Sequence, residues 1–218
     1  MKVDKLRTVI IYIIIILLGL VCLLPLLNIV AISFSSSAAV EGNMVGLIPV
    51  GFSTAAYKKI LEDSQFWHSF LISVERVVLA LIINFVLIVL MAYPLSKTNA
   101  QFRGRNIYAN LMIFAMLFNG GMIPTFLVVK SYGLLNTVWA LVLPGAVPIF
   151  NVILVMNFFA AVPKELEEAA FIDGANPLQV LTKIFIPISK PVLATVSLFS
   201  IVGSWNDFYS GLIYMSKA

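Results

Sequence analysis

Five stretches of this chain are apolar for about 20 residues or longer and contain few charged side chains. A helix needs about 20 mostly apolar residues to cross the roughly 30 Å hydrocarbon layer of a membrane. The stretches are continuous rather than alternating, and lipid requires backbone polar groups to be satisfied within each segment. The sequence therefore predicts an all-α integral membrane protein. The five predicted spans cover about residues 9–32, 67–93, 107–129, 138–159 and 191–208.

Composition supports a location in the membrane and excludes several function classes. Charged residues make up 11% of the chain, whereas about a quarter is usual for a soluble domain. The net charge of +4 does not indicate nucleic-acid binding, because the basic residues lie at the ends of apolar stretches and form no patch. Cys22 is the one cysteine, so neither an intrachain disulfide nor a thiolate metal cluster is predicted.

The N-terminal stretch is predicted to be a retained span with its N-terminus in the cytoplasm. It is longer than the roughly 7–15 residues of a signal-peptide core. With this orientation, nine basic residues lie inside and four outside, as the positive-inside rule favours. The inside residues are Lys2, Lys5, Arg7, Lys97, Arg103, Arg105, Lys164, Lys183 and Lys190, and the outside ones are Lys58, Lys59, Lys130 and Lys217.

The long inside loop, residues 160–190, carries explicit helix signals. Pro163 suits the first position of a helix, and Gly174 suits the left-handed conformation that ends one. Asn176 is a good N-cap for a second short helix running toward Phe185. The loop is therefore predicted to form a short helix, a glycine corner and another short helix. An ordinary re-entry loop would explain the same signals equally well.

The residue types at several positions of this loop resemble the EAA loop of ABC importer permeases. They are Glu168, Ala169 and Ala170, then Asp173, Gly174 and Ala175, then Ile184, Pro187 and Pro191. Flanking stretches resemble the carbohydrate-uptake branch, its MalG-type subunits and, within those, the LplC/YtcP-like permeases. These stretches are 120–125, 133–137, 139–146 and 203–206.

The resemblance implies an ABC importer type I permease fold, with residues 1–218 as a single transmembrane domain and the loop 160–190 holding a cytoplasmic coupling helix. Family members usually have six spans, so a chain with five is expected to be either truncated before a sixth or to end at an unusual place. The ATPase-coupling role would fall to Glu168, Ala169, Ala170, Asp173, Gly174, Ala175, Ile184 and Pro187.

The resemblance also implies partners in a bacterial cell membrane. These are a second homologous permease, two ATPase subunits that hold ATP and Mg²⁺, an extracytoplasmic solute-binding protein and a sugar substrate. The chain has no glycine-rich loop ending in Lys-Ser or Lys-Thr. We therefore expect it to bind no cofactor and to be a transporter subunit rather than an enzyme.

Polar side chains at or within the spans are candidates for a substrate path. The candidates are Asn119, Asn151, Trp205, Asn206 and Asp207. Hydrogen bonding between helices and the interfacial aromatic belt are alternative roles for the same residues. Glu75 and Arg76 are adjacent in the second span, so they are not expected to pair with each other. They either act in function or reach the interface or a neighbouring helix.

Two other functions compete with carbohydrate import. The coupling loop is shared among ABC importers, so a permease for another solute, such as a polyamine or a phosphonate, is an alternative. An intramembrane enzyme would need convergent catalytic groups, such as paired aspartates or a His/Glu metal set. One histidine and scattered carboxylates do not supply them, and no catalytic or metal site is predicted.

Overall fold

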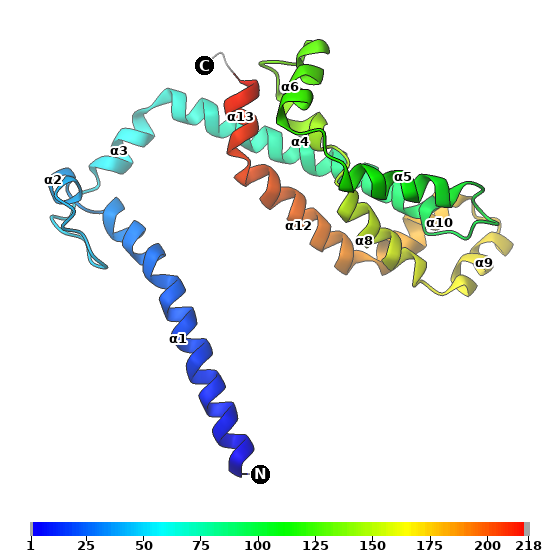
Figure 1. Cartoon of the computed structure of the whole chain (residues 1–218), viewed down its shortest axis with the longest axis horizontal. Helices are drawn as coiled ribbons and strands as arrows, with labels where there is room; N and C mark the ends of the chain where they lie inside the picture. Colours follow the sequence, from blue (N-terminus) through cyan, green and yellow to red (C-terminus); the bar gives the residue numbers. More distant parts are fainter. Residues whose placement is uncertain (1, 216–218) are drawn as a thin grey trace. The chain divides into compact units, whose positions relative to one another are not determined.

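The computed structural model describes residues 2–215, which form helices and connecting segments without a β-strand (Figure 1). Lys217, one of the residues in the orientation count, lies outside this range. The chain divides into two compact units, residues 1–70 and 71–218, and each is described by itself.

The first unit contains α1 (Lys2–Ser33), α2 (Ser37–Glu41) and α3 (Ala55–Glu62). Helix α1 includes Pro25 without a break and is long and apolar enough to cross a membrane. The segment after it folds back onto its C-terminal end. Asn28 Nδ2 donates a hydrogen bond of 2.7 Å to the Gly46 carbonyl oxygen, and the rings of Phe34 and Phe52 stack.

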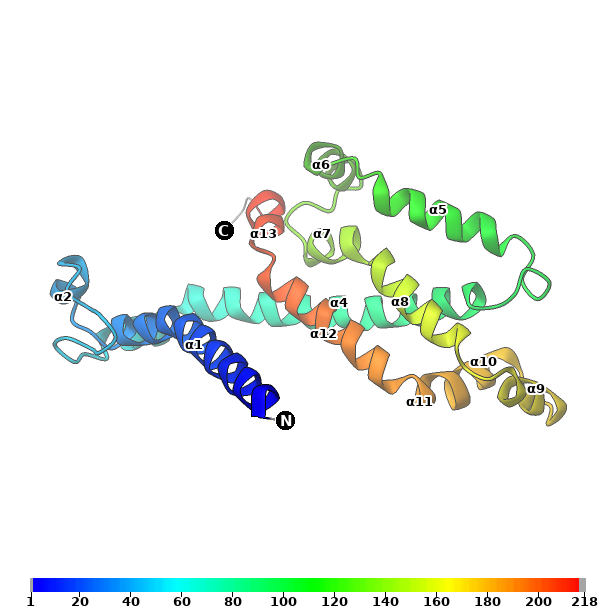
Figure 2. The same ribbon diagram turned by 60° about the horizontal axis from the view of Figure 1, so that its bottom comes forward.

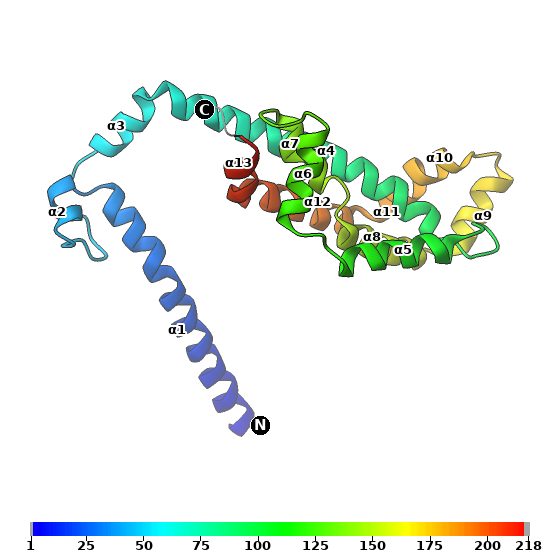
Figure 3. The ribbon, with the colours of Figure 1, turned by 45° about the horizontal axis from the view of Figure 1, so that its top comes forward.

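The second unit contains the rest of α4 and all later helices. Their bounds are α4 (Ser64–Leu95), α5 (Arg105–Leu117), α6 (Met122–Ser131), α7 (Val138–Val142), η1 (Leu143–Gly145), α8 (Ile149–Ala160), α9 (Lys164–Ile172), α10 (Pro177–Val180), η2 (Leu181–Phe185), α11 (Ile186–Ile188), α12 (Lys190–Asn206) and α13 (Phe208–Tyr214). Within this unit, α9 and α10 lie at one end and α6 and α13 at the other (Figures 2 and 3).

Only two of the predicted spans are single continuous helices among the described residues. Helices α1 and α4 are each long enough to cross a membrane, and the number rises to five if each bent helix pair forms one span. The predicted span 107–129 is divided into α5 and α6, which meet at 113°. The predicted span 138–159 bends by 48° before α8, and α12 ends at Asn206 rather than at residue 208.

The breaks have local causes. Gly121, which precedes α6, has φ of 85° and ψ of −178°, a conformation that is essentially restricted to glycine. Pro144 and Pro148 interrupt the next span because proline lacks the amide hydrogen that a continuing helix would use. The second predicted span ends at residue 93, whereas α4 continues through Pro94 to Leu95.

One apolar core joins the spans of the second unit to the loop 160–190. Ala92 of α4, Val155 of α8 and Val180 of α10 are each fully buried. The small side chain at position 92 permits close helix approach, as is common between membrane helices. The other buried members are Ile88, Val89, Leu95, Met112, Val152, Phe159, Val162, Leu181, Phe185, Val192, Leu193 and Val196. This core fixes where α9 and α10 lie against α4 and α8.

Candidate functional site

The predicted helix–corner–helix segment is present at residues 164–180 and is confirmed by its caps. Helix α9 begins at Lys164, so Pro163 is the residue before the helix rather than its first, one position from the expectation. Gly174 has φ of +81°, in the left-handed region. Asn176 and Gln179 exchange two hydrogen bonds of 2.9 Å between side chains and backbone amides, forming a capping box.

A groove of about 450 Å³ lies between the two helices of this segment. Five of the eight residues expected to couple to an ATPase line it: Ala170, Asp173, Gly174, Ala175 and Ile184. Gln179, Val180 and Lys183 complete the lining. The remaining three, Glu168, Ala169 and Pro187, are exposed. Five of the expected residues therefore share one groove, and the other three lie on the surface outside its lining.

Two adjacent carboxylates of α9 have opposite surroundings. Glu168 is exposed, whereas Glu167 is 7% exposed. Successive helical residues point about 100° apart, so one faces outward while the other faces the rest of the chain. Ala170, one turn after Glu167, packs against the apolar core and marks the same inward face.

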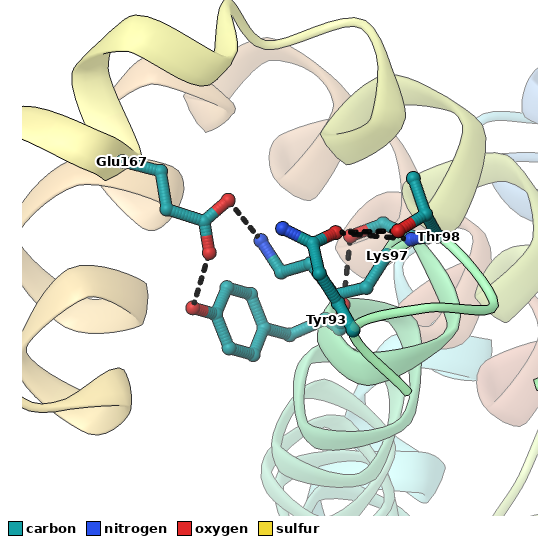
Figure 4. A network of polar contacts seen from close by, with 6 residues as sticks. Tyr93, Lys97, Thr98 and Glu167 are labelled. Atoms are coloured by element: carbon teal, nitrogen blue, oxygen red, sulfur yellow. Dashed lines mark hydrogen bonds and ion pairs between the residues drawn. The ribbon is translucent and has the colours of Figure 1, made fainter. Parts of the chain in front are cut away.

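Glu167 binds Tyr93 in the last turn of α4 and Lys97 just after that helix (Figure 4). Lys97 Nζ lies 2.7 Å from its Oε2, and Tyr93 Oη donates to Oε1 at 3.2 Å. The side chains of Lys97 and Glu167 are 12% and 10% exposed. The contact therefore joins residues 70 positions apart in an environment largely removed from water.

Aromatic rings surround the ammonium group of Lys97. Nζ lies 4.1 Å from the ring centre of Tyr93 and 4.2 Å from that of Phe185. The two rings meet edge to face, and Phe185 meets Phe159 of α8 in the same way. Burial lowers the pKa of Lys97, and the hydrogen bond and negative charge of Glu167 oppose that change. The site is thus a cation held between two rings and one carboxylate.

Such a pair is costly to break from one side. Removing one partner of a buried ion pair leaves an uncompensated charge and typically costs about 3–5 kcal/mol, whereas replacing both partners can be nearly neutral. The sequence prediction gave no site role to Lys97, Glu167, Tyr93 or Phe185. Their pairing depends on folding of distant segments, although the inward helical face shared with Ala170 was a usable signal for Glu167.

A second polar feature lies within the predicted spans. A pocket of about 380 Å³ is lined by residues of α4, α8, α12 and the segments near them. Arg76 forms an ion pair with Asp207, and its Nη1 donates to the Asp207 carbonyl oxygen at 2.9 Å. Asn84 and Ser200 share a hydrogen bond of 3.3 Å. Most polar groups of this pocket therefore bind one another and join helices.

The structure brings together two of the five candidate path residues. Asn151 and Asp207 both line this pocket. Asn119 instead accepts a hydrogen bond of 2.8 Å from the Gly121 amide at the break between α5 and α6. Trp205 and Asn206 are exposed and do not line the pocket. Among the described residues, no group of three or more His, Cys, Asp or Glu side chains is placed to hold a metal ion.

Comparisons with known proteins place these features in a family context. Residues 48–218 match the family model described as binding-protein-dependent transport system inner membrane component. Protein LplC of Bacillus subtilis is 45% identical over 200 residues, which are 92% of this chain and 67% of that protein. The polygalacturonan/rhamnogalacturonan transport system permease protein YtcP of Bacillus subtilis is 42% identical, over 99% of this chain and 74% of that protein.

A solved structure agrees with this match. The fold is similar to a chain in the crystal structure of a bacterial ABC transporter involved in the import of the acidic polysaccharide alginate. The TM-score is 0.92 and the identity 34%, with 100% of this chain and 77% of that chain covered.

Proposed function

Because this chain belongs to the family of inner membrane components of binding-protein-dependent transport systems, we propose that it is a permease subunit of an ATP-driven importer of oligosaccharides. The membrane-permease assignment follows from the family match and from apolar helices long enough to span a bilayer. The resemblance to LplC/YtcP-like permeases expected from the sequence is confirmed.

The carbohydrate assignment depends mainly on one observation, the 42% identity to YtcP over 99% of this chain. That relative is named for polygalacturonan and rhamnogalacturonan transport, and the structural relative for alginate import. Diacetylchitobiose uptake system permease protein NgcG of Streptomyces coelicolor is 30% identical over 94% of this chain. The shared chemistry of these named substrates is that of linked sugars, several of them acidic. No observation favours a polyamine or a phosphonate.

The surface at residues 164–180 is the proposed docking site for a separate ATPase. Glu168, one of its exposed carboxylates, and the groove around Gly174 supply a charge and a cleft that a partner surface can bind. A short helix with a capped corner transmits rigid-body motion better than a flexible loop. ATP and Mg²⁺ would bind the two ATPase subunits, and this chain would conduct and couple.

The rest of the proposed assembly follows from the family. A second, homologous permease would enclose the path with this single transmembrane domain, and an extracytoplasmic solute-binding protein would deliver the sugar. The N-terminus would lie in the cytoplasm of a bacterial cell, because the basic residues are concentrated on that side. Asn151 and Asp207, which share a pocket, are the proposed path residues of this chain.

The proposal is tested by reconstitution. This chain, its partner permease, its binding protein and its ATPase are purified together and placed in liposomes that contain ATP on the ATPase side. Uptake of labelled oligogalacturonides, chitooligosaccharides, spermidine and a phosphonate is then measured. We expect ATP-dependent uptake of one of the oligosaccharides. Uptake of spermidine or the phosphonate with neither oligosaccharide transported would contradict the carbohydrate assignment, and failure to co-purify with an ATPase would contradict the coupling assignment.

A further inference from the structure

The end of α4 and the inward face of α9 are joined by contacts that the family assignment does not explain. Glu167 is turned away from the exposed Glu168 and therefore from any partner that binds the outer side of α9. Its carboxylate binds Lys97 through one oxygen and Tyr93 through the other. One oxygen is thus bound by Tyr93 in the last turn of α4, and the other by Lys97, two residues after the helix ends at Leu95. The Lys97 amide donates a hydrogen bond of 3.2 Å to the Pro94 carbonyl oxygen, which ties this turn to the end of α4.

These contacts restrict how α9 moves. Lys97 Nζ is held by the carboxylate at 2.7 Å and by two ring faces at about the same separation from each, 4.1 and 4.2 Å. A rotation of α9 about its axis would carry Glu167 away from Lys97 and leave both charges buried. Since an unpaired buried charge is strongly unfavourable, rotation or sliding of α9 is resisted unless α4 follows.

Helix α4 is the span to which this motion would be passed. It is continuous over 32 residues, without the bends that divide the later spans. Farther along α4, Arg76, Ala80 and Asn84 line the pocket of about 380 Å³ within the predicted spans. A displacement of the cytoplasmic end of α4 is therefore transmitted directly to the wall of the pocket.

We propose that Lys97 is a positioning residue that locks α9 to α4 through Glu167, so that motion of the docking segment moves the pocket wall. This role rests on the proposed function of the chain as an ATP-driven permease. Lys97 acts through Glu167 and contacts neither sugar nor nucleotide. Tyr93 supports the same carboxylate and has a secondary part in the lock.

The test uses the complete importer in liposomes, with oligogalacturonides as the transported probe. In Lys97→Met, which keeps the aliphatic stem, we expect the complex to assemble and hydrolyse ATP while sugar transported per ATP falls at least about fivefold, the lower end of typical coupling between sites. Arg103→Met is the matched control, because Arg103 is an exposed cation of the same inside turn. It is expected to transport normally.

A double variant separates coupling from mere stability. Lys97→Met with Glu167→Gln leaves no unpaired charge, so thermal stability of the complex should recover toward that of the unaltered importer. Sugar transported per ATP should stay low, because the lock is still missing. Recovery of that ratio in the double variant would overturn the proposal, as would an unchanged ratio in Lys97→Met or a loss that merely parallels loss of assembled complex.

A readout without sugar keeps the proposal independent of the carbohydrate assignment. In a Cys22→Ser background, Ala80→Cys places a thiol of this chain on the α4 wall of the pocket. ATP should change its rate of thiol labelling in the otherwise unaltered importer and in the Arg103→Met control. The change should be lost in Lys97→Met, and an unchanged ATP response there would contradict the proposed lock even if oligogalacturonides prove not to be the substrate.

Discussion

Arg76 and Asp207 are 131 positions apart and form an ion pair inside the predicted membrane region. Arg76 lies in α4, and Asp207 is the single residue between the end of α12 and the start of α13. The Asp207 side chain also accepts a hydrogen bond of 3.1 Å from the Ser210 amide and so caps α13. One carboxylate therefore neutralises a buried cation and begins a helix, while Glu75, adjacent to Arg76, is exposed.

We predict that Asp207→Asn destabilises the permease by about 3 kcal/mol, at the lower end for a buried pair broken from one side. The lower end is expected because the Asp207 side chain is 33% exposed, so water partly compensates the remaining guanidinium. Thermal unfolding of the detergent-purified importer measures the effect. Glu75→Gln, which removes a neighbouring exposed carboxylate, is the control and should be nearly neutral. Equal unfolding of the two variants would show that the ion pair adds nothing to stability.

The left-handed corner at Gly174 gives a second prediction. An added Cβ at this position meets no heavy atom within 4 Å, so a side chain has room, and the penalty comes from φ of +81° alone. Gly174→Val should lose ATPase co-purification and uptake, because a β-branched residue rarely adopts positive φ. Gly174→Asn has similar bulk but tolerates this conformation and should retain much of both activities. If the two variants lose activity equally, side-chain bulk at the docking surface rather than backbone strain is responsible.

Signals that are local in sequence predicted the segment 164–180 well. Gly174 and Asn176 act on their immediate backbone neighbours, so their residue types alone indicate a corner and a new helix. The same reasoning placed Pro163 within one position of the start of α9.

Features set by distant contacts were missed. Apolar periodicity measures whether a stretch is long enough to span, but it carries little information about a bend such as the 113° break between α5 and α6. The Gly120–Gly121 pair was visible in the sequence, yet its conformation was not. Likewise, Lys97 was counted only as a topology signal, because nothing near it in sequence indicates that it meets Glu167.

The surroundings of Lys97 give a prediction about pH. Burial lowers the pKa of this ammonium group, and the hydrogen bond and charge of Glu167 raise it part of the way back. A lysine whose pKa is lower in the folded chain binds fewer protons there than in the unfolded chain. The contribution of Lys97 to the free energy of unfolding therefore increases with pH, in the alkaline range between its pKa in the folded chain and its pKa in the unfolded chain.

Glu167→Gln removes the charge that raises the pKa of Lys97, so the pKa should fall further and this alkaline range should begin at a lower pH. Amine labelling of the assembled importer, followed by mass spectrometry across a pH series, measures this, because only the neutral amine reacts. Lys97 should reach half-maximal labelling at a lower pH in the variant than in the unaltered chain. Lys190 is exposed and does not line the docking groove, so its labelling curve serves as the internal reference for reagent and access. A curve for Lys97 that stays in place or moves to higher pH would show that Glu167 does not stabilise the charged form.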